Sequence, residues 1–351
     1  MELEALAGQV LIAGFPGGEP PAAIRAALAA DALGGVVLFR RNIEGPRQLA
    51  ELLRRLLRDA AGAPLVAIDQ EGGRVQRLRA PVLELPPMRA LGRRGDPALT
   101  REAARLLGRQ LRALGLSMNF APVLDVDSNP ANPVIGDRSF SSDPAVVIEQ
   151  GLAFAAGLAD AGVLACGKHF PGHGDTDLDS HLALPTLRHG RERLDAVELA
   201  PFRRAQTIPA LMTAHVVFET LDPTVPATLS RRVVHELLRE ELGYGGVVIS
   251  DDLEMKAVRD RWGVLEGGVR AIEAGCDMLL VCSDVDACLA LRSALAARAD
   301  ADAGFRARLG EAAERSRALR RRSPPRVGDI EAALADPAVA AMAKRLAELA
   351  P

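Results

Sequence analysis

The chain is short of the residue that marks disulfide-stabilised or zinc-ribbon proteins. Its 351 residues contain four cysteines, Cys166, Cys276, Cys282 and Cys288, with no CxxC spacing among them. Four thiols are too few for a disulfide framework, and their spacing does not suit a zinc finger. Because free cysteine is usually buried, we expect four buried thiols in a reducing compartment.

Long apolar runs and an excess of one charge are also absent. No stretch of 18 apolar residues occurs, and the N-terminal sequence MELEALAGQVLIAGF lacks the basic start of a signal peptide. The chain has 43 Lys+Arg and 46 Asp+Glu, a formal net charge of −3, which gives no electrostatic footprint for nucleic acid. We therefore expect a cytoplasmic protein that binds neither membrane nor nucleic acid.

Short apolar segments recur along the chain, with helical stretches between them. The predicted strands are rich in Val, Leu and Ile and end in polar residues, as strands buried on both faces do: Val10–Ala13, Gly35–Phe39, Leu65–Ile68, Ser117–Ala121, Val163–Gly167, Ala210–Ala214, Val247–Ser250 and Met278–Val281. The predicted helices include Pro21–Ala32, Gln48–Ala60, Thr100–Leu114, Ala145–Ala161 and Arg231–Leu242. Eight alternating units predict an α/β fold, a single (β/α)8 barrel of the TIM type spanning residues 1–351.

The C-terminal part of the chain predicts additional helices. From about residue 303 the sequence is rich in Ala, Leu and Arg, and Ser323-Pro324-Pro325 interrupts it before a last predicted helix, Ile330–Ala350. No linker separates this part from the barrel. We expect these helices to pack on the outside of the barrel.

Charged and imidazole side chains follow most of the predicted strands. They include Arg40-Arg41, Asp69 to Arg74, Asp125 and the later Arg138, Lys168-His169, His215, and Asp251-Asp252. Active sites of such barrels lie at the C-terminal ends of the strands. Because these groups would be costly in a core, their position predicts one shared pocket.

The segment Lys168 to His181, KHFPGHGDTDLDSH, holds three histidines and three aspartates. Its glycines and proline predict a long loop over the barrel mouth. In one interpretation the histidines and aspartates bind a metal. In the other, His181 is a general acid/base oriented by Asp179, because residues two apart in an extended chain project from the same side. We expect His173, between two glycines, to shape the loop.

Two adjacent carboxylates, Asp251 and Asp252, end the seventh predicted strand. Because neighbouring strand residues face opposite ways, only one of them should point into the barrel mouth. Either could serve as a nucleophile or stabiliser in sugar chemistry, or as a metal ligand. We expect Asp252 to cap the helix that follows.

Six segments carry a resemblance to a known family, and they occur in the family's order. They are GGVVLFRRN (34–42), AIDQEGGRVQRL (67–78), NFAPVLDV (119–126), GDRSF (136–140), KHFPGHGDTDLDSH (168–181) and GVVISDDLEM (246–255). On these residues the chain resembles glycoside hydrolase family 3, specifically its single-domain bacterial β-N-acetylglucosaminidases (β-hexosaminidases) of peptidoglycan recycling.

The resemblance implies a retaining β-N-acetylglucosaminidase that removes terminal N-acetylglucosamine from GlcNAc-anhydroMurNAc-peptides. It assigns Asp251 as the nucleophile that forms a covalent glycosyl-enzyme, and His181 with Asp179 as the acid/base pair. The residues that would hold the sugar are Asp69, Arg77, Arg138, Lys168 and His169. No cofactor or metal is expected. We expect a monomer whose partner is a small carbohydrate substrate.

Aromatic residues make up only 3% of the chain, with one Trp and one Tyr. Clefts for long polysaccharides usually stack sugar rings on aromatic faces. The scarcity of aromatic residues therefore favours a small polar pocket that binds one terminal sugar, and hence exo action.

Other functions compete with this one. A zinc-dependent barrel hydrolase would use His169, His173, His215 and Asp251, but the HxH pair typical of such barrels is missing. A phosphorylase would transfer the sugar to phosphate instead of water at the same site. Substrate-assisted cleavage would need no enzyme nucleophile, and a non-catalytic sugar-binding barrel would be expected to lack Asp251 or His181.

Overall fold

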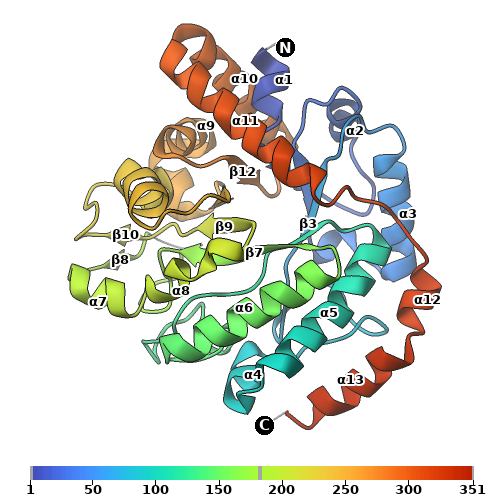
Figure 1. Cartoon of the computed structure of the whole chain (residues 1–351). Coiled ribbons are helices and arrows are strands. Elements are labelled where there is room, and N and C mark those ends of the chain that lie inside the picture. The colour runs from blue at the N-terminus through green and yellow to red at the C-terminus, as the bar shows by residue number, and fades with distance from the viewer. Residues whose placement is uncertain (1–2, 181–183, 350–351) are drawn as a thin grey trace.

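The computed structural model describes residues 3–180 and 184–349 of the chain. Its centre is a closed barrel of eight parallel strands in the order β1-β12-β11-β9-β7-β6-β3-β2 (Figure 1). These strands are β1 (Leu11–Ala13), β2 (Gly35–Leu38), β3 (Leu65–Ile68), β6 (Met118–Asn119), β7 (Leu164–Phe170), β9 (Ala210–Thr213), β11 (Val247–Asp252) and β12 (Met278–Val281). The predicted (β/α)8 barrel is confirmed, and each predicted strand is present.

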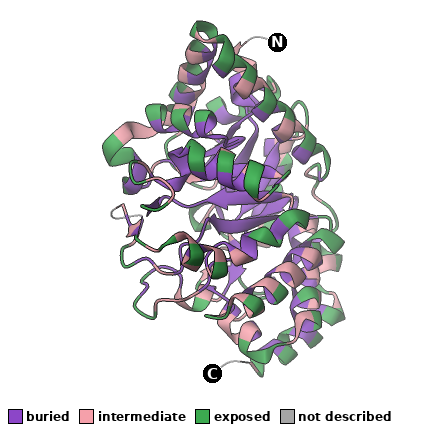
Figure 2. Ribbon diagram, turned by 60° about the vertical axis from the view of Figure 1, so that its left-hand side comes forward, coloured by how far each residue is buried: buried purple, intermediate pink, exposed green. Residues whose placement is uncertain are grey.

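Helices surround the barrel and leave its strands buried (Figure 2). They are α1 (Leu3–Gly8), α2 (Ala22–Ala29), α3 (Pro46–Leu57), α4 (Met88–Arg94), α5 (Pro97–Leu114), α6 (Pro144–Asp160), α7 (Arg191–Ala196), α8 (Ala200–Arg203), α9 (Lys256–Ala274), α10 (Val285–Ala301), α11 (Ala303–Arg321), α12 (Ile330–Leu334) and α13 (Pro337–Ala347). A π-helix, η5 (Arg232–Glu241), and short 3-10 turns such as η2 (Gly136–Arg138) complete the layer. In the described part of the chain, no helix has the length and apolar character needed to span a bilayer.

Two pairs of short strands lie outside the barrel, and the sequence did not predict them. β4 (Gln70–Gly72) and β5 (Val75–Gln76) form an antiparallel hairpin directly after β3. β8 (Thr186–Leu187) pairs in parallel with β10 (Val217–Phe218). With two or three residues each, they are too short to show a period of two in the sequence.

Alternate residues of the barrel strands form two separate apolar layers. One buried cluster draws on all eight strands and includes Ala67, Cys166 and Ile249, so it fills the barrel interior. The other cluster, which includes Ile68 and Val248, joins the strands to the helices. Because side chains alternate along a strand, residues two positions beyond an interior residue continue on the interior side.

Two predicted helices differ from the structure in where a helix begins, and for a common reason. Asp96 accepts a hydrogen bond from the backbone of Leu99 and is followed by Pro97, so α5 begins at Pro97 rather than at Thr100. A second Asp-Pro pair, Asp336-Pro337, divides the predicted helix Ile330–Ala350 into α12 and α13. Asp336 caps α13, and Pro337 cannot continue α12. An aspartate cap followed by proline at the first position is a helix start signal.

The C-terminal helices pack on the outer layer of the barrel. Helix α11 contacts α1, α9 and α10 and reaches strands β11 and β12, whereas α12 and α13 lie against α5 (Figure 1). A buried carboxylate fixes α11 in place: Asp277, just before β12, binds Arg308 of α11 at 2.7 Å and also binds Arg239 of η5. Its Oδ2 accepts the backbone N–H of Val248 at 3.0 Å.

This arrangement predicts a large stability loss for Asp277→Asn. The substitution removes the carboxylate charge that pairs with Arg239, which is 9% exposed, and leaves this buried cation without that partner. We expect the free energy of unfolding to fall by about 3 kcal/mol, measured by urea denaturation. The control is Asp300→Asn, whose side chain is 78% exposed and should change stability by less than about 0.5 kcal/mol. Equal losses in both variants would contradict the role of Asp277.

Candidate active site

A cavity of about 440 Å³ opens at the C-terminal ends of the barrel strands. Seven of the eight predicted site residues line it: Asp69, Arg77, Arg138, Lys168, His169, Asp179 and Asp251. The eighth, His181, lies outside the described residues. A larger hollow of about 730 Å³ between residues 80–87 and helix α13 is lined mainly by apolar side chains and offers little for chemistry.

The strands deliver these side chains through their alternation. Leu65 and Ala67 of β3 belong to the interior cluster, as do Leu164 and Cys166 of β7 and Val247 and Ile249 of β11. The next residues of the same parity are Asp69, Lys168 and Asp251, and all three line the cavity. The site is therefore the polar end of the layer that fills the barrel.

The segment that begins at Lys168 is only in part the predicted loop. Lys168, His169 and Phe170 extend β7 and pair with β9, Lys168 with Met212 and Phe170 with Thr213. The loop begins at Pro171. The prediction of a loop from Lys168 onward was wrong, because pairing with a neighbouring strand holds polar residues in extended conformation.

Lys168 is the centre of a buried charge network. Its side chain is 3% exposed, and Nζ lies 2.7 Å from Oδ1 of Asp69 and 2.6 Å from Oε1 of Glu71. Arg77 donates to the other oxygen of Asp69 at 3.2 Å. Burial alone would lower the pKa of Lys168, but the two carboxylates raise it, so the lysine is charged at neutral pH.

Glu71 joins Lys168 to Arg138. Two parallel hydrogen bonds of 2.9 Å run from the Arg138 guanidinium to the Glu71 carboxylate, whose side chain is 1% exposed. Burial would raise the pKa of Glu71, but Arg138 and then Lys168 outweigh it and hold that pKa well below the usual value. The network thus contains three cations and two carboxylates and carries one net positive charge beside the cavity.

His169 is oriented by a carboxylate from the segment that follows β6. Its Nδ1 lies 2.6 Å from Oδ2 of Asp125, which is completely buried, and Oδ1 of Asp125 accepts the backbone N–H of His173 at 2.7 Å. Burial would raise the pKa of Asp125, but His169 lowers it, so the carboxylate accepts the Nδ1 proton. Nε2 is then the ring nitrogen that Asp125 does not engage.

His173 holds the loop together. Its Nδ1 contacts Oγ1 of Thr176 at 2.8 Å and its Nε2 contacts Oγ of Ser180 at 2.9 Å. Burial, assisted by nearby His169, lowers the pKa of His173 to about 4, so the ring is neutral at pH 7. These contacts agree with a shaping role for His173. They also hold Ser180, the residue that follows Asp179, against the ring.

The expectation that only one of Asp251 and Asp252 faces the mouth is wrong, since both line the cavity. The pairing of β11 with β12 shifts register between Ile249 and Asp252, and such a bulge breaks the alternation. Asp252 is also not the helix cap, because the N-cap position of α9 is Met255, whose side chain makes no capping hydrogen bond. Its Oδ1 accepts backbone N–H groups of Glu254 and Cys282 instead.

The two carboxylates differ in environment. Burial, together with the nearby Glu254 and Asp251 carboxylates, raises the pKa of Asp252 to about 7. Oδ1 of Asp251 accepts the backbone N–H of Asp252 at 2.8 Å, which fixes the orientation of this carboxylate. Asp251 thus projects into the cavity from a rigid strand end.

The rival zinc set does not assemble. Within residues 3–180 and 184–349, His169, His173, His215 and Asp251 do not bring ligand atoms together as a metal-binding group. Both ring nitrogens of His173 are engaged by hydroxyls, and those of His215 contact Oγ1 of Thr228 and the carbonyl of Asp252. This geometry argues against a zinc hydrolase of that design.

Two residues of the site were left without a role by the sequence. Glu71 and Asp125 follow predicted strands, but each acts on residues far along the chain: Glu71 binds Arg138, 67 residues away, and Asp125 binds His169, 44 residues away. Their position at strand ends was the only signal available, and it does not identify a partner.

Loss of stability at acid pH should depend in part on His173. Its pKa rises from about 4 in the folded state to near 6.5 on unfolding, so only the unfolded chain binds this proton between those values, and stability falls as the pH falls. For His173→Gln, which keeps a donor and an acceptor, we expect a decrease in unfolding free energy between pH 7 and 4.5 that is about 2 kcal/mol smaller than in the wild type. Urea titrations at each pH measure it.

The matched control for this prediction is His235→Gln, since His235 is 36% exposed. Its pH dependence should follow that of the wild type. A wild-type pH dependence in His173→Gln would show that His173 does not titrate as its burial indicates.

Comparison with known proteins places this site in a family. A protein-family model, described as "Glycosyl hydrolase family 3 N terminal domain", matches residues 3–315. A β-hexosaminidase of Thiobacillus denitrificans is 44% identical over 259 residues, 72% of this chain and 72% of that protein. A family 3 β-N-acetylglucosaminidase from Paenibacillus sp. str. FPU-7 superposes with a TM-score of 0.92 and 43% identity, over 99% of this chain and 69% of that one.

A smaller relative is similar over nearly its whole length. The structure of native NagZ from Neisseria gonorrhoeae superposes with a TM-score of 0.81 and 32% identity, over 97% of this chain and 98% of that one. The matched family description covers the barrel and every described residue of the cavity. The chain belongs to glycoside hydrolase family 3 and is a glycoside hydrolase.

Proposed function

We propose that the protein is an exo-acting, retaining β-N-acetylglucosaminidase that removes terminal N-acetylglucosamine from peptidoglycan fragments of the GlcNAc-anhydroMurNAc-peptide type. The observation that carries the proposal is the meeting of Asp251, Asp179 and the Lys168 network on one cavity of the barrel. The β-hexosaminidase relatives at 40–44% identity support the choice of sugar.

Asp251 is the proposed nucleophile. Its carboxylate attacks the anomeric carbon and forms an ester bond as the glycosidic bond breaks, while His181 donates a proton to the leaving oxygen. In the second step His181 removes a proton from water, which attacks the same carbon and releases Asp251. Two displacements at one carbon return the β configuration. Asp179 orients His181 and stabilises its cationic form.

The charge network is the proposed binding site for the sugar. Asp69, Arg77, Arg138, Lys168 and His169 present fixed donors and acceptors to hydroxyl and acetamido groups. Because its two carboxylates already pair with its three cations at 2.6–3.2 Å, the network is organised before the substrate arrives. A cavity of about 440 Å³ suits a single terminal sugar, with the remainder of the substrate extending outward.

We further propose a cytoplasmic location and a monomeric state. All four cysteines are free and buried, as expected in a reducing compartment. Among the described residues, the large apolar side chains that stand exposed are Leu178 and Leu265, and two separate residues do not make an interface patch.

A 5-fluoro N-acetylglucosamine-type trap tests the nucleophile directly. The fluorine slows hydrolysis of the covalent intermediate, so we expect a stoichiometric increase in intact-protein mass and, by peptide mapping, a sugar on Asp251. Asp251→Asn is the matched control and should gain no mass. An absent adduct with retained activity would favour substrate-assisted cleavage, and an adduct elsewhere would exclude Asp251.

The acceptor is tested in the same enzyme. Turnover of an aryl N-acetyl-β-glucosaminide should be independent of phosphate and should release free N-acetylglucosamine. A requirement for phosphate, with a sugar 1-phosphate as product, would make the protein a phosphorylase.

The network predicts that Glu71→Gln impairs catalysis without contacting the reacting carbon. The amide cannot hold both Arg138 and Lys168 in place, and small displacements of positioning groups cost about 100-fold in rate. We expect kcat/KM for the aryl glycoside to fall by about 100-fold. Glu84→Gln is the control, because Glu84 binds the exposed Arg79 and should leave kcat/KM unchanged. An unimpaired Glu71→Gln enzyme would exclude this positioning role.

A further inference from the structure

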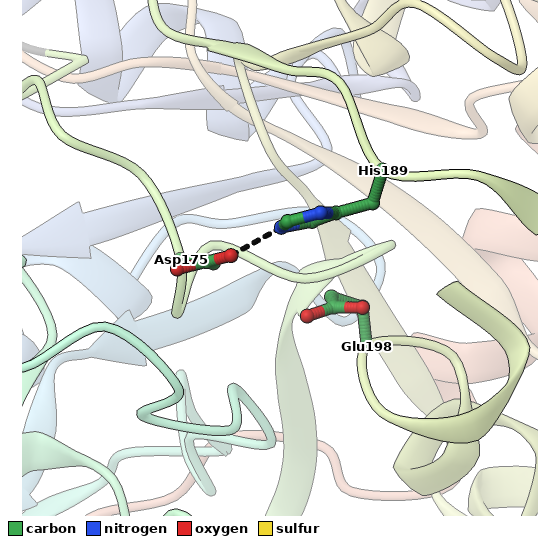
Figure 3. Close-up of side chains that lie close together, drawn as sticks. All are labelled: Asp175, His189 and Glu198. Atoms are coloured by element: carbon green, nitrogen blue, oxygen red, sulfur yellow. Dashed lines mark hydrogen bonds and ion pairs between the residues drawn. The ribbon is translucent and has the colours of Figure 1, made fainter. Parts of the chain in front are cut away.

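Three side chains with metal-ligand chemistry converge outside the cavity. Asp175 lies in the loop after β7, His189 precedes helix α7, and Glu198 lies between α7 and α8. A ligand atom of each lies within 4.8 Å of the others. Figure 3 shows Asp175 and His189 joined by a hydrogen bond between Oδ2 and Nε2, with the carboxylate of Glu198 directed toward them.

Glu198 is the unusual member of this group. Its side chain is 1% exposed, and Oε1 accepts a hydrogen bond of 3.0 Å from Arg193. Its other oxygen, Oε2, is buried without a hydrogen-bond partner among the described residues. An unsatisfied buried carboxylate oxygen is costly. A bound cation would supply the partner that this oxygen lacks among the described residues.

The backbone of the loop that begins at Pro171, after β7, lies directly against Glu198. A Cβ added at Gly172 would come within 2.9 Å of the Glu198 Cβ, and Gly172 has a φ of +137°. The close approach requires glycine at this position. The three ligand-type groups are thus held by chain segments that already pack together.

We propose that Asp175, His189 and Glu198 form a structural binding site for a divalent cation of the zinc type. One imidazole nitrogen and two carboxylate oxygens are three of the four ligands that tetrahedral zinc takes, and water would supply the fourth. The two carboxylates and Arg193 leave one net negative charge, which favours a dication. Binding would replace the direct His189–Asp175 hydrogen bond and give Oε2 of Glu198 a partner.

The site would fix the loop that carries the catalytic pair. Asp175 precedes Asp179 by four residues, and the cation would join this loop to the segment between α7 and α8. The cation takes part in no step of the reaction, and its role is the same whichever sugar or acceptor the enzyme uses.

Zinc binding by the full-length protein tests the proposal. After treatment with chelator and dialysis, isothermal titration calorimetry with zinc chloride should show one bound equivalent. His189→Gln and Glu198→Gln should each weaken binding by about 100-fold or more, since even outer-shell changes cost 10–100-fold. At free zinc of about 100 times Kd, the wild-type Tm should rise by about 3 °C, and the variants should show no rise.

Two control variants separate this site from other zinc ligands. His235→Gln alters another partly exposed histidine that pairs with a carboxylate, Glu240, at 3.2 Å. Asp251→Asn removes a carboxylate of the active-site cavity. Both should bind zinc like the wild type, and circular dichroism without metal should show that all variants fold.

Two outcomes would overturn the proposal. In one, the wild type binds no zinc at micromolar concentration, and the group is an ion pair with a neighbouring carboxylate. In the other, binding persists in both His189→Gln and Glu198→Gln but is lost in Asp251→Asn, and zinc binds in the active-site cavity instead.

Discussion

The buried charge of Lys168 is the constraint on which the active site depends. An ammonium group that is 3% exposed is tolerated only because Asp69 and Glu71 lie within 2.7 Å of it. Glu71 then needs Arg138, and Asp69 binds Arg77. One buried cation thus fixes the ends of β7 and β3, the hairpin β4–β5 and the turn η2. The positions of these donors and acceptors at the cavity are therefore set by the cost of leaving a buried charge unpaired.

The same alternation of side chains produces both the core and the site. Along β3, β7 and β11 the interior residues are apolar through most of the strand and become Asp69, Lys168 and Asp251 at its end. The apolar layer stabilises the barrel, whereas the polar end carries the chemistry. The proposed nucleophile, Asp251, therefore stands on a rigid element, which favours the fixed geometry that nucleophilic attack requires.

The loop after β7 is held mainly by polar contacts. His173 is bonded through both ring nitrogens to hydroxyls of the same loop, and Asp125 anchors its backbone. Such contacts specify one conformation when all of them are made. The proposed cation site would add a further link from Asp175 to Glu198. The loop that presents Asp179 is thus supported from the barrel on one side and from α7 and α8 on the other.

The sequence by itself determined the eight strands, several of the helices and seven of the residues that line the cavity, because these follow from local periodicity and recognisable motifs. The tertiary structure alone decided which groups pair. Glu71 meets Arg138 and Asp125 meets His169 only once the barrel closes. The bulge that turns both Asp251 and Asp252 toward the cavity depends on pairing with β12. Hydrogen bonds between distant segments leave no periodic trace in the sequence, so only the folded chain reveals them.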